Sequence, residues 1–276
     1  MTEHWLTEQL HPFYRKALRV EDKLVDENTP FQHIEVYRTA YFGNTLVLDG
    51  IIQLTELDNP GYHECIVHIP MLSQPNPRRV LIVGGGDGGS LQQVLRYPSV
   101  EEAVVCELDE RVVAICREHF PAFGDPFCDL RARVVYEDAF TFLQRSQAEF
   151  DVIISDTTDP VGMAERLFSP EFYELMKAAL VPGGAVATQC EQMYFDSGLI
   201  REVFATARRL SQHPAYYHAL IPTYPGGGIG FMYMSDTPWE AGLERAYPPG
   251  QMNYLNPSVH RAVFALPEFF RRTLDE

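Results

Sequence analysis

Five carboxylates follow short apolar runs in the middle of the chain, and their positions suggest one binding edge. Asp87 lies in "GGGDGG", Glu107 in "CELDE", Asp138 in "YEDAF", and Asp156 and Asp159 in "SDTTDP". Each motif directly follows a run typical of a buried parallel strand. Because ligands bind beyond the carboxyl ends of the strands in an open α/β sheet, we predict a site lined by negative charge.

The glycine turn around Asp87 limits the kind of ligand. Such turns bind phosphate through backbone N–H groups and a helix N-terminus, and an aspartate there repels an anion. Glu107 lies 20 residues after Asp87, a spacing that suits hydrogen bonds from ribose hydroxyls. Asp138 is placed either to accept from an adenine amine or to cap the next helix. These features favour an adenosyl sulfonium compound over a dinucleotide.

The same aspartate separates two kinds of group transfer. In a methyltransferase, the glycine loop usually lies beside the carboxylate and the amine of the methionine tail. Asp87 tolerates the amine but repels the carboxylate, whereas a decarboxylated tail keeps only the ammonium group. The turn therefore predicts transfer of an aminopropyl group rather than a methyl group.

Two patterns of hydrophobicity divide the chain. Up to about residue 55, apolar and polar residues alternate, as in "HIEVYRTA", "TLVLDG" and "IIQLTE", which predicts short antiparallel strands. Apolar runs at 80–83, 103–106, 133–136, 152–155 and 185–189 then alternate with helical segments such as 109–118 and 170–180. The segments 217–225 and 229–236 predict two further strands. We expect an α/β protein with a parallel sheet, divided into a β-domain at 1–58 and a catalytic domain at 59–276.

Composition excludes several other classes. A net charge of −16 disfavours nucleic acid and anionic membranes as partners. The absence of an apolar run near the roughly 18 residues of a membrane helix, and of a signal pattern at the start, predicts a cytoplasmic protein. Five widely spaced cysteines without C-x-x-C indicate reduced thiols. "HECIVH" resembles a zinc motif, but its histidines stand roughly 140° apart on a helix, so we expect no shared metal.

The complete set of motifs resembles one enzyme family. "GGGDGG", "CELD", "FDVIISDTTDP", "IPTYPGGGIGF", "LVLDGIIQLTELDNPGYHE" and "YLNPSVHRAVFALPEF" are similar to the motifs of spermidine synthases, the putrescine aminopropyltransferases, across residues 5–272. The resemblance implies a small N-terminal β-domain and a Rossmann-like, methyltransferase-type domain. It also implies decarboxylated S-adenosylmethionine as donor, putrescine as acceptor, and spermidine and 5′-methylthioadenosine as products. A homodimer or homotetramer without metal or other cofactor is expected.

The resemblance also assigns roles on the donor side. Asp87 matches the residue that holds the aminopropyl ammonium, Glu107 the ribose ligand and Asp138 the residue near the adenine amine. Gln53 and His63 match N-terminal residues that reach into the pocket beside the donor. From the sequence alone, His63 is equally well read as a helix-surface histidine.

The remaining roles concern catalysis and the acceptor. Asp156 matches the proposed general base, assisted by the Tyr62 hydroxyl. Asp159, Tyr224 and Glu191 match acceptor-site residues, although Glu191 also suits a structural role and both tyrosines suit the core. The loop "DTTDPVGMAERLF" is expected either to close over the substrates or to be an ordinary crossover.

Four positions depart from the family pattern and leave the acceptor open. Leu57 and Asn59 replace charged residues, Ala139 replaces a frequent glycine, and Met193 replaces a glutamine found in some members. Agmatine, cadaverine or a triamine is therefore an alternative acceptor. A non-catalytic adenosyl or polyamine binder and an NAD-dependent oxidoreductase, with phosphate near 84–86, are the other classes considered.

Overall fold

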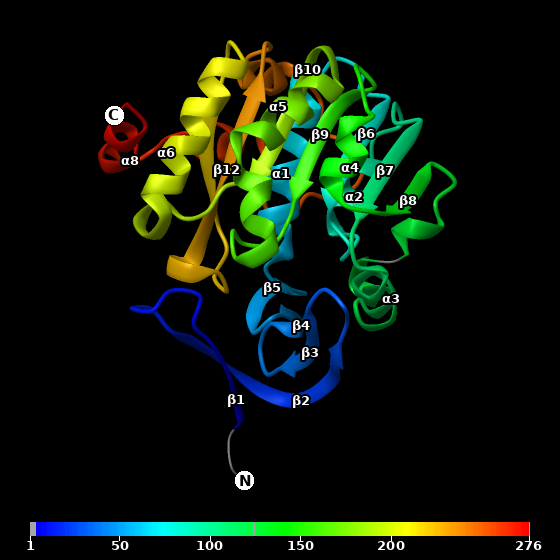
Figure 1. Cartoon of the computed structure of the whole chain (residues 1–276), viewed down its shortest axis with the longest axis vertical. Helices are drawn as coiled ribbons and strands as arrows, with labels where there is room; N and C mark the ends of the chain where they lie inside the picture. The colour runs from blue at the N-terminus through cyan, green and yellow to red at the C-terminus, as the bar shows by residue number, and fades with distance from the viewer. Residues whose placement is uncertain (1–3, 124, 276) are drawn as a thin grey trace.

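The computed structural model describes residues 4–123 and 125–275, and these form two sheets (Figure 1). A five-stranded sheet has the order β1-β2-β3-β4-β5, and a seven-stranded sheet has the order β11-β12-β10-β9-β6-β7-β8. The smaller sheet lies below the larger unit in Figure 1, and α1 begins directly after β5. The expected α/β class with an N-terminal antiparallel sheet is confirmed.

The N-terminal sheet is an antiparallel meander, as the alternating pattern predicts. Its strands are β1 (His4–Glu8), β2 (Lys16–Asn28), β3 (His33–Thr39), β4 (Gly43–Leu48) and β5 (Ile51–Thr55). Asp49 and Gly50 join β4 to β5 with φ values of 49° and 80°. Positive φ at both residues of a two-residue turn matches the right-handed twist of the strands, so "DG" closes the hairpin.

The larger sheet holds five parallel strands in the order β10-β9-β6-β7-β8. They are β6 (Arg79–Gly84), β7 (Glu102–Glu107), β8 (Ala132–Tyr136), β9 (Phe150–Asp156) and β10 (Leu180–Gln189). Each contains one predicted apolar run. β11 (Ala215–Leu220) and β12 (Gly228–Ser235) extend the sheet in antiparallel fashion. The predicted strand 217–225 thus ends early, because 221–227 turn the chain back into β12.

Helices cover both faces of this sheet. They are α1 (Asn59–Ser73), α2 (Gly89–Leu95), α3 (Glu110–His119), α4 (Ala139–Gln144), α5 (Pro170–Ala179), α6 (Met193–Leu210), α7 (Pro257–Ala262) and α8 (Glu268–Asp275). Short 3₁₀ segments lie at Pro121–Phe123, Pro126–Cys128, Gly162–Phe168, Pro225–Gly227 and Trp239–Glu244. Among the described residues, no helix is both long and apolar enough to cross a bilayer.

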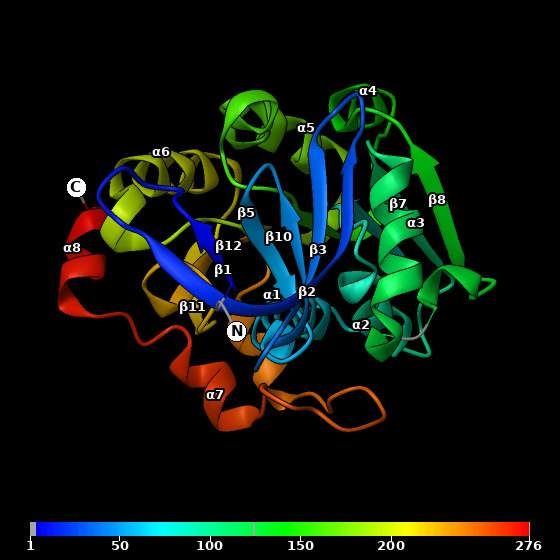
Figure 2. The same cartoon turned by 90° about the horizontal axis from the view of Figure 1, so that it is seen from below.

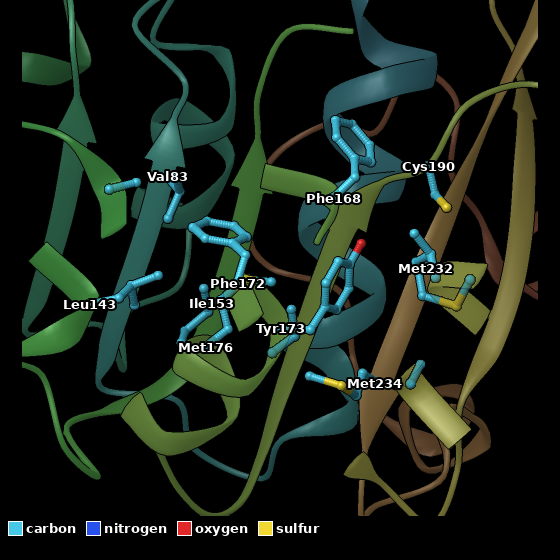
Figure 3. Close-up of a cluster of buried hydrophobic side chains, with 14 of the residues drawn as sticks. Val83, Leu143, Ile153, Phe168, Phe172, Tyr173, Met176, Cys190, Met232 and Met234 are labelled. Carbon is cyan, nitrogen blue, oxygen red and sulfur yellow. The ribbon is translucent and has the colours of Figure 1, made fainter. Parts of the chain in front are cut away.

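Two apolar cores lie on opposite faces of the sheet. On one face, Phe172 and Tyr173 of α5 pack against Ile153 of β9 and Met232 of β12 (Figure 3). On the other face, α1 and α2 pack against the same strands. α1 carries buried residues along almost its whole length, because it lies between the sheet and the C-terminal segment. Burial on all sides holds its first turn, with Tyr62 and His63, in a fixed position.

α3 joins the two sheets. Val112 and Ile115 of α3 pack with Ile34, Val36 and Leu46 of the N-terminal sheet. The Asp109 side chain accepts a hydrogen bond from the Arg111 N–H at 3.0 Å, so Asp109 caps α3. The carboxyl ends of the parallel strands therefore face the N-terminal sheet across a fixed gap.

Candidate active site

A cavity of about 500 Å³ lies between the N-terminal sheet and the carboxyl edge of the parallel strands. Leu46, Leu48 and Ile52 form part of its apolar wall. The cavity is also lined by nine of the ten predicted site residues: Gln53, Tyr62, Asp87, Glu107, Asp138, Asp156, Asp159, Glu191 and Tyr224. Parallel strands place their ends side by side, so motifs spread over more than 70 residues of sequence meet here.

The glycine turn between β6 and α2 is shaped by close approach of its neighbours. Gly84 has a φ of 72°, and a Cβ there would overlap the carbonyl oxygen of Asp156. At Gly86, a Cβ would lie 2.7 Å from the Glu107 carboxylate. The turn therefore packs directly against the ends of β9 and β7 and places Asp87 in the cavity.

The first half of the cavity contains Glu107 and Asp138. Glu107 accepts hydrogen bonds from the Gly86 N–H at 3.1 Å and the Asp109 N–H at 2.9 Å. Burial raises the pKa of Glu107 to about 7. Asp138 caps α4 by accepting from the Thr141 N–H at 3.0 Å, and it also lines the cavity. Its capping role is thus confirmed, while its contact with a ligand stays a prediction.

Asp156 stands at the middle of the cavity with both carboxylate oxygens bonded. The Tyr62 hydroxyl donates to Oδ1 at 2.8 Å, and the Ser90 hydroxyl donates to Oδ2 at 2.6 Å. Burial and the negative charge of Asp87 raise the pKa of Asp156 above its ordinary value, although both hydroxyls and the His63 ring act in the opposite direction. Ser90 is completely buried in α2, and no sequence motif singled it out.

His63 lies behind the cavity rather than in its wall. Its ring is 1% exposed, and Nε2 is 3.4 Å from Asp87 Oδ1 and 4.0 Å from Asp156 Oδ2. The interpretation of a helix-surface histidine is therefore wrong. Burial lowers the pKa of His63, but the two carboxylates outweigh this effect and raise it. The same ring outweighs the effect of burial on Asp87, whose pKa is lowered.

His63, Asp87 and Asp156 also meet the geometric condition for a metal site, since one ligand atom of each lies within 4.8 Å of the others. Both Asp156 oxygens already accept hydroxyl hydrogen bonds. The Gly89 N–H donates to Asp87, and the imidazole packs against Gly89. The local donors thus suit an ion pair between His63 and Asp87.

The second half of the cavity holds Asp159, Glu191 and Tyr224. Gln53 Nε2 donates to Asp159 Oδ2 at 3.4 Å, and the Tyr224 hydroxyl donates to the Gln53 carbonyl at 2.5 Å. Burial raises the pKa of Asp159. Glu191 is 4% exposed, and its Oε1 has no hydrogen-bond partner among the described residues. Burial, with the charges of Asp159 and Asp196, raises its pKa well above the ordinary value.

The hairpin formed by β1 and β2 contacts the loop that carries Tyr224 and so supports this half of the cavity. Lys16 Nζ lies 2.8 Å from Glu8 Oε1 and donates to the Thr223 carbonyl, next to Tyr224. Glu8 Oε2 accepts from the Ile52 N–H at 2.7 Å. Burial lowers the pKa of Lys16 and raises that of Glu8, although each partner's charge opposes the shift. This ion pair ties β1 and β2 to the loop after β11.

Some cavity residues were not predicted. Gln32 donates to Asp109 Oδ2 at 3.0 Å, and His11 belongs to the loop between β1 and β2. Both lie in irregular segments without a local motif, so only folding brings them to the cavity. Among the departures from the family pattern, Ala139 lines the cavity and Met193 is buried in the core, whereas Leu57 is half exposed before α1.

The segment 157–168 forms the outer wall. Val161 and Met163 line the cavity while their side chains remain largely exposed. Gly162 has a φ of 60° and starts the 3₁₀ segment Gly162–Phe168. Apolar side chains that face both the cavity and solvent are suited to cover a bound ligand, and closure of this segment stays a prediction.

The arrangement joins two acidic regions through Asp156. Glu107, Asp138 and Asp87 line one side, and Asp159 and Glu191 line the other. Buried carboxylates are stabilised by cationic partners with N–H donors. The cavity can therefore hold two cationic ligands next to each other, with one carboxylate at their junction.

Comparisons with known proteins agree with this chemistry. A family model described as "Spermidine synthase tetramerisation domain" matches residues 4–56, and one described as "Spermine/spermidine synthase domain" matches residues 59–241. A polyamine aminopropyltransferase from Leptospira biflexa is 40% identical over 97% of this chain and 96% of its own length. A spermidine synthase from Dictyostelium discoideum is 40% identical over 98% and 97%, respectively.

Solved structures give the same result. A crystal structure of spermidine synthase with the transition-state analogue AdoDATO has a TM-score of 0.94 and 31% identity, covering 99% of this chain and 95% of that one. Spermidine synthase from Thermotoga maritima has a TM-score of 0.92 and 30% identity, covering 99% and 94%. The chain belongs to the spermine/spermidine synthase family.

Proposed function

We propose that this protein is a spermidine synthase. It transfers the aminopropyl group of decarboxylated S-adenosylmethionine to putrescine, and it releases spermidine and 5′-methylthioadenosine. The observation that carries this proposal is the continuous run of carboxylates that line one cavity, with Asp156 between its two halves. The names of the similar proteins support the same reaction.

The donor occupies the half that contains Glu107. Its ribose hydroxyls bond Glu107, its adenine lies near Asp138, and its ammonium group pairs with Asp87. The ion pair between His63 and Asp87 lowers the repulsion between Asp87 and Asp156 in the free enzyme. His63 therefore positions Asp87 and Asp156 from outside the cavity. Gln53 lies at the boundary between the donor half and the acceptor half.

The acceptor occupies the other half. Its distal ammonium binds Asp159 and Glu191, whose burial leaves them in need of a cationic partner. The butyl chain of putrescine packs against Tyr224 in the apolar part of this wall. The reacting amine then lies next to Asp156 and Tyr62.

The reaction is a single displacement. The lone pair of the reacting amine forms a C–N bond to the aminopropyl carbon, the C–S bond breaks, and its electron pair converts the sulfonium to a neutral thioether. An alkyl amine has a pKa near 10, so only about one molecule in 10³ is neutral at pH 7. The sulfonium charge lowers the pKa of the reacting amine, and Asp156 accepts its proton.

Neither a metal nor a further cofactor is part of this proposal, because a sulfonium is already a good leaving group. Activity should persist after treatment with a chelator. Loss of activity on chelation, restored by a divalent cation, would contradict this part of the mechanism.

We propose that the enzyme is a cytoplasmic homodimer or homotetramer, with an N-terminal domain at 1–58 and a catalytic domain at 59–276. The tetramerisation-domain match over residues 4–56 supports an oligomer. Light scattering after size-exclusion chromatography measures the number of subunits, and a monomer would refute the assembly.

The decisive test offers the enzyme decarboxylated donor with an equimolar mixture of putrescine, agmatine, cadaverine and spermidine. Mass spectrometry should detect 5′-methylthioadenosine and mainly spermidine formed from isotope-labelled putrescine. A dominant product from another amine would identify that amine as the acceptor. A donor that stays intact in the mixture would refute the function.

A second test isolates the base. Asp156→Asn should lower turnover by about 10²–10⁴-fold, the usual contribution of a general base. Calorimetry should show nearly unchanged binding of 5′-methylthioadenosine, which reports a folded donor site. Turnover close to that of the wild type would remove Asp156 as the base.

A further inference from the structure

His11 closes the acceptor half of the cavity from the N-terminal domain. It lies in the loop between β1 and β2, which in both views runs toward α6 and away from α3 and β8 (Figures 1 and 2). Its side chain lines the cavity and is 13% exposed. Its Nε2 lies 3.6 Å from Asp196 Oδ2 of α6, the helix that begins just after Glu191, so it stands beyond the distal carboxylates rather than near the donor.

Two aromatic rings hold this imidazole in place. It stacks on Phe195 with a centroid distance of 4.9 Å and on Phe13 with a centroid distance of 5.5 Å. Phe13 is largely exposed, whereas Phe195 belongs to the first turn of α6. The ring therefore forms a wall between the cavity and the solvent.

Behind this wall lies a carboxylate that the proposed reaction does not use. His11 Nε2 is 3.6 Å from Asp196 Oδ2, and that oxygen is buried without a hydrogen-bond partner among the described residues. Glu191 Oε1 is likewise buried and unpartnered, and Glu191 lines the cavity. Asp196 has φ −126° and ψ 32° inside α6, so a break in the helix accompanies its position.

The number of charges exceeds what a diamine needs. Its single distal ammonium faces Asp159, Glu191 and, behind the imidazole, Asp196. Lys16, whose positive charge lowers the pKa of Asp159, already pairs with Glu8. A buried carboxylate is stabilised by a nearby cation, and in this structure the imidazole of His11 occupies the space beside Asp196.

We propose that His11 sets the length of the acceptor: it limits the reaction to diamines by covering Asp196. Without the imidazole, Asp196 and Glu191 form a subsite for one further ammonium group, and a linear triamine becomes a substrate. This inference rests on the proposed function. An added aminopropyl unit lengthens the acceptor by about 5 Å, from bond lengths like those of the backbone, so its inner nitrogen and outer amine need the space and charge beyond Glu191.

The chemical step is the same for the longer acceptor. A primary amine of the triamine attacks the aminopropyl carbon, the C–S bond breaks with its electrons going to sulfur, and Asp156 takes the proton. The products are a linear tetraamine and 5′-methylthioadenosine. Only the distal ammonium groups differ in their contacts.

The experiment compares kcat/KM for spermidine and for putrescine in the wild type, His11→Ala and His11→Gln. In His11→Ala the ratio should rise by at least about tenfold, which corresponds to about 1.4 kcal/mol of added binding. His11→Gln retains most of the wall and should keep a ratio near that of the wild type. His33→Ala, a histidine of β3 that pairs with Asp26 away from the cavity, is the matched control.

A double variant tests the role of the charge. His11→Ala with Asp196→Asn should lose most of the gain, because the open space then lacks its carboxylate. An unchanged ratio in His11→Ala, an equal gain in the double variant, or a wild type that already uses spermidine as well as putrescine would overturn the inference.

The two proposals fail in different ways. If the wild type converts none of these amines, the proposed function fails, and the inference fails with it. If the wild type converts putrescine but His11→Ala converts nothing, calorimetric titration of spermidine and putrescine into enzyme saturated with 5′-methylthioadenosine replaces the kinetic ratio. A rise of at least about tenfold in the ratio of spermidine affinity to putrescine affinity, relative to the wild type, supports the inference. An unchanged affinity ratio refutes it.

Discussion

Removing the Ser90 hydroxyl should move the acid limb of the pH–rate profile without changing a residue of the cavity wall. Ser90 Oγ donates to Asp156 Oδ2 at 2.6 Å, and the residue is completely buried beneath the cavity. A hydrogen bond to a charged group contributes about 1.5–3 kcal/mol. At 1.36 kcal/mol per pKa unit, its loss corresponds to about 1–2 units.

The sign follows from which form of Asp156 the bond stabilises. The hydroxyl donates to the carboxylate, so it holds the pKa of Asp156 down against burial and the charge of Asp87. In Ser90→Ala the pKa rises further, and the base is protonated at a higher pH. The acid limb of kcat should therefore move up by about 1–2 pH units, while rates well above the limb approach those of the wild type.

The assay measures release of 5′-methylthioadenosine at saturating donor and acceptor from about pH 5 to pH 9, where kcat reports groups in the bound complex. Ser73→Ala is the matched control, because Ser73 is equally buried but donates to the Pro70 carbonyl in α1. Coincident limbs in the wild type, Ser90→Ala and Ser73→Ala would show that Asp156 is not the titrating base.

Three further changes test other parts of the site. Asp87→Asn should weaken the decarboxylated donor by about 10–100-fold in calorimetry, the equivalent of one charge-assisted bond. It should affect 5′-methylthioadenosine, which lacks the ammonium group, much less, and equal losses would contradict an ammonium contact. Burial raises the pKa of Glu107 to about 7, so 5′-methylthioadenosine should bind more weakly as pH falls through 7, because the Glu107 carboxylate that accepts the ribose hydrogen bonds becomes neutral. Glu107→Gln should remove this pH dependence of binding. If the pH dependence persists in Glu107→Gln, another group is responsible for it. Glu64 accepts the backbone N–H groups of residues 253, 254 and 255 at 2.8, 2.9 and 2.7 Å. Glu64→Ala should cost about 3 kcal/mol, or about 6–12 °C in Tm by calorimetry, and an unchanged Tm would refute this role.

The donor side was accessible from sequence because its information is local. A buried apolar run followed by a carboxylate places that carboxylate at a strand end, and parallel strands end at one edge. Glu107, Asp138 and Asp156 follow this rule, and all three line the cavity. Asp109 was equally predictable as a cap, because capping depends on residues two or three positions away.

The second half of the cavity and the surroundings of Asp156 depend instead on contacts between residues that are far apart in the sequence. Ser90 meets Asp156 across 66 residues, and Lys16 meets Thr223 across 207. His63 has a helical position that suits either a surface or a core, and only the packing of α1 between the sheet and the C-terminal segment buries it behind Asp87. No periodicity or spacing marks such pairs.

The sequence by itself thus determined the succession of strands, the acidic edge and the preference for a cationic adenosyl ligand, since each depends on neighbours along the chain. Only the tertiary structure decided that Ser90 holds the second oxygen of Asp156, opposite the one bonded by Tyr62, and that His11 stands against Asp196. The physical reason is that burial and electrostatic contact act through space. Segments that are far apart in the sequence are in contact in the folded chain, and these contacts set the pKa and the position of the side chains.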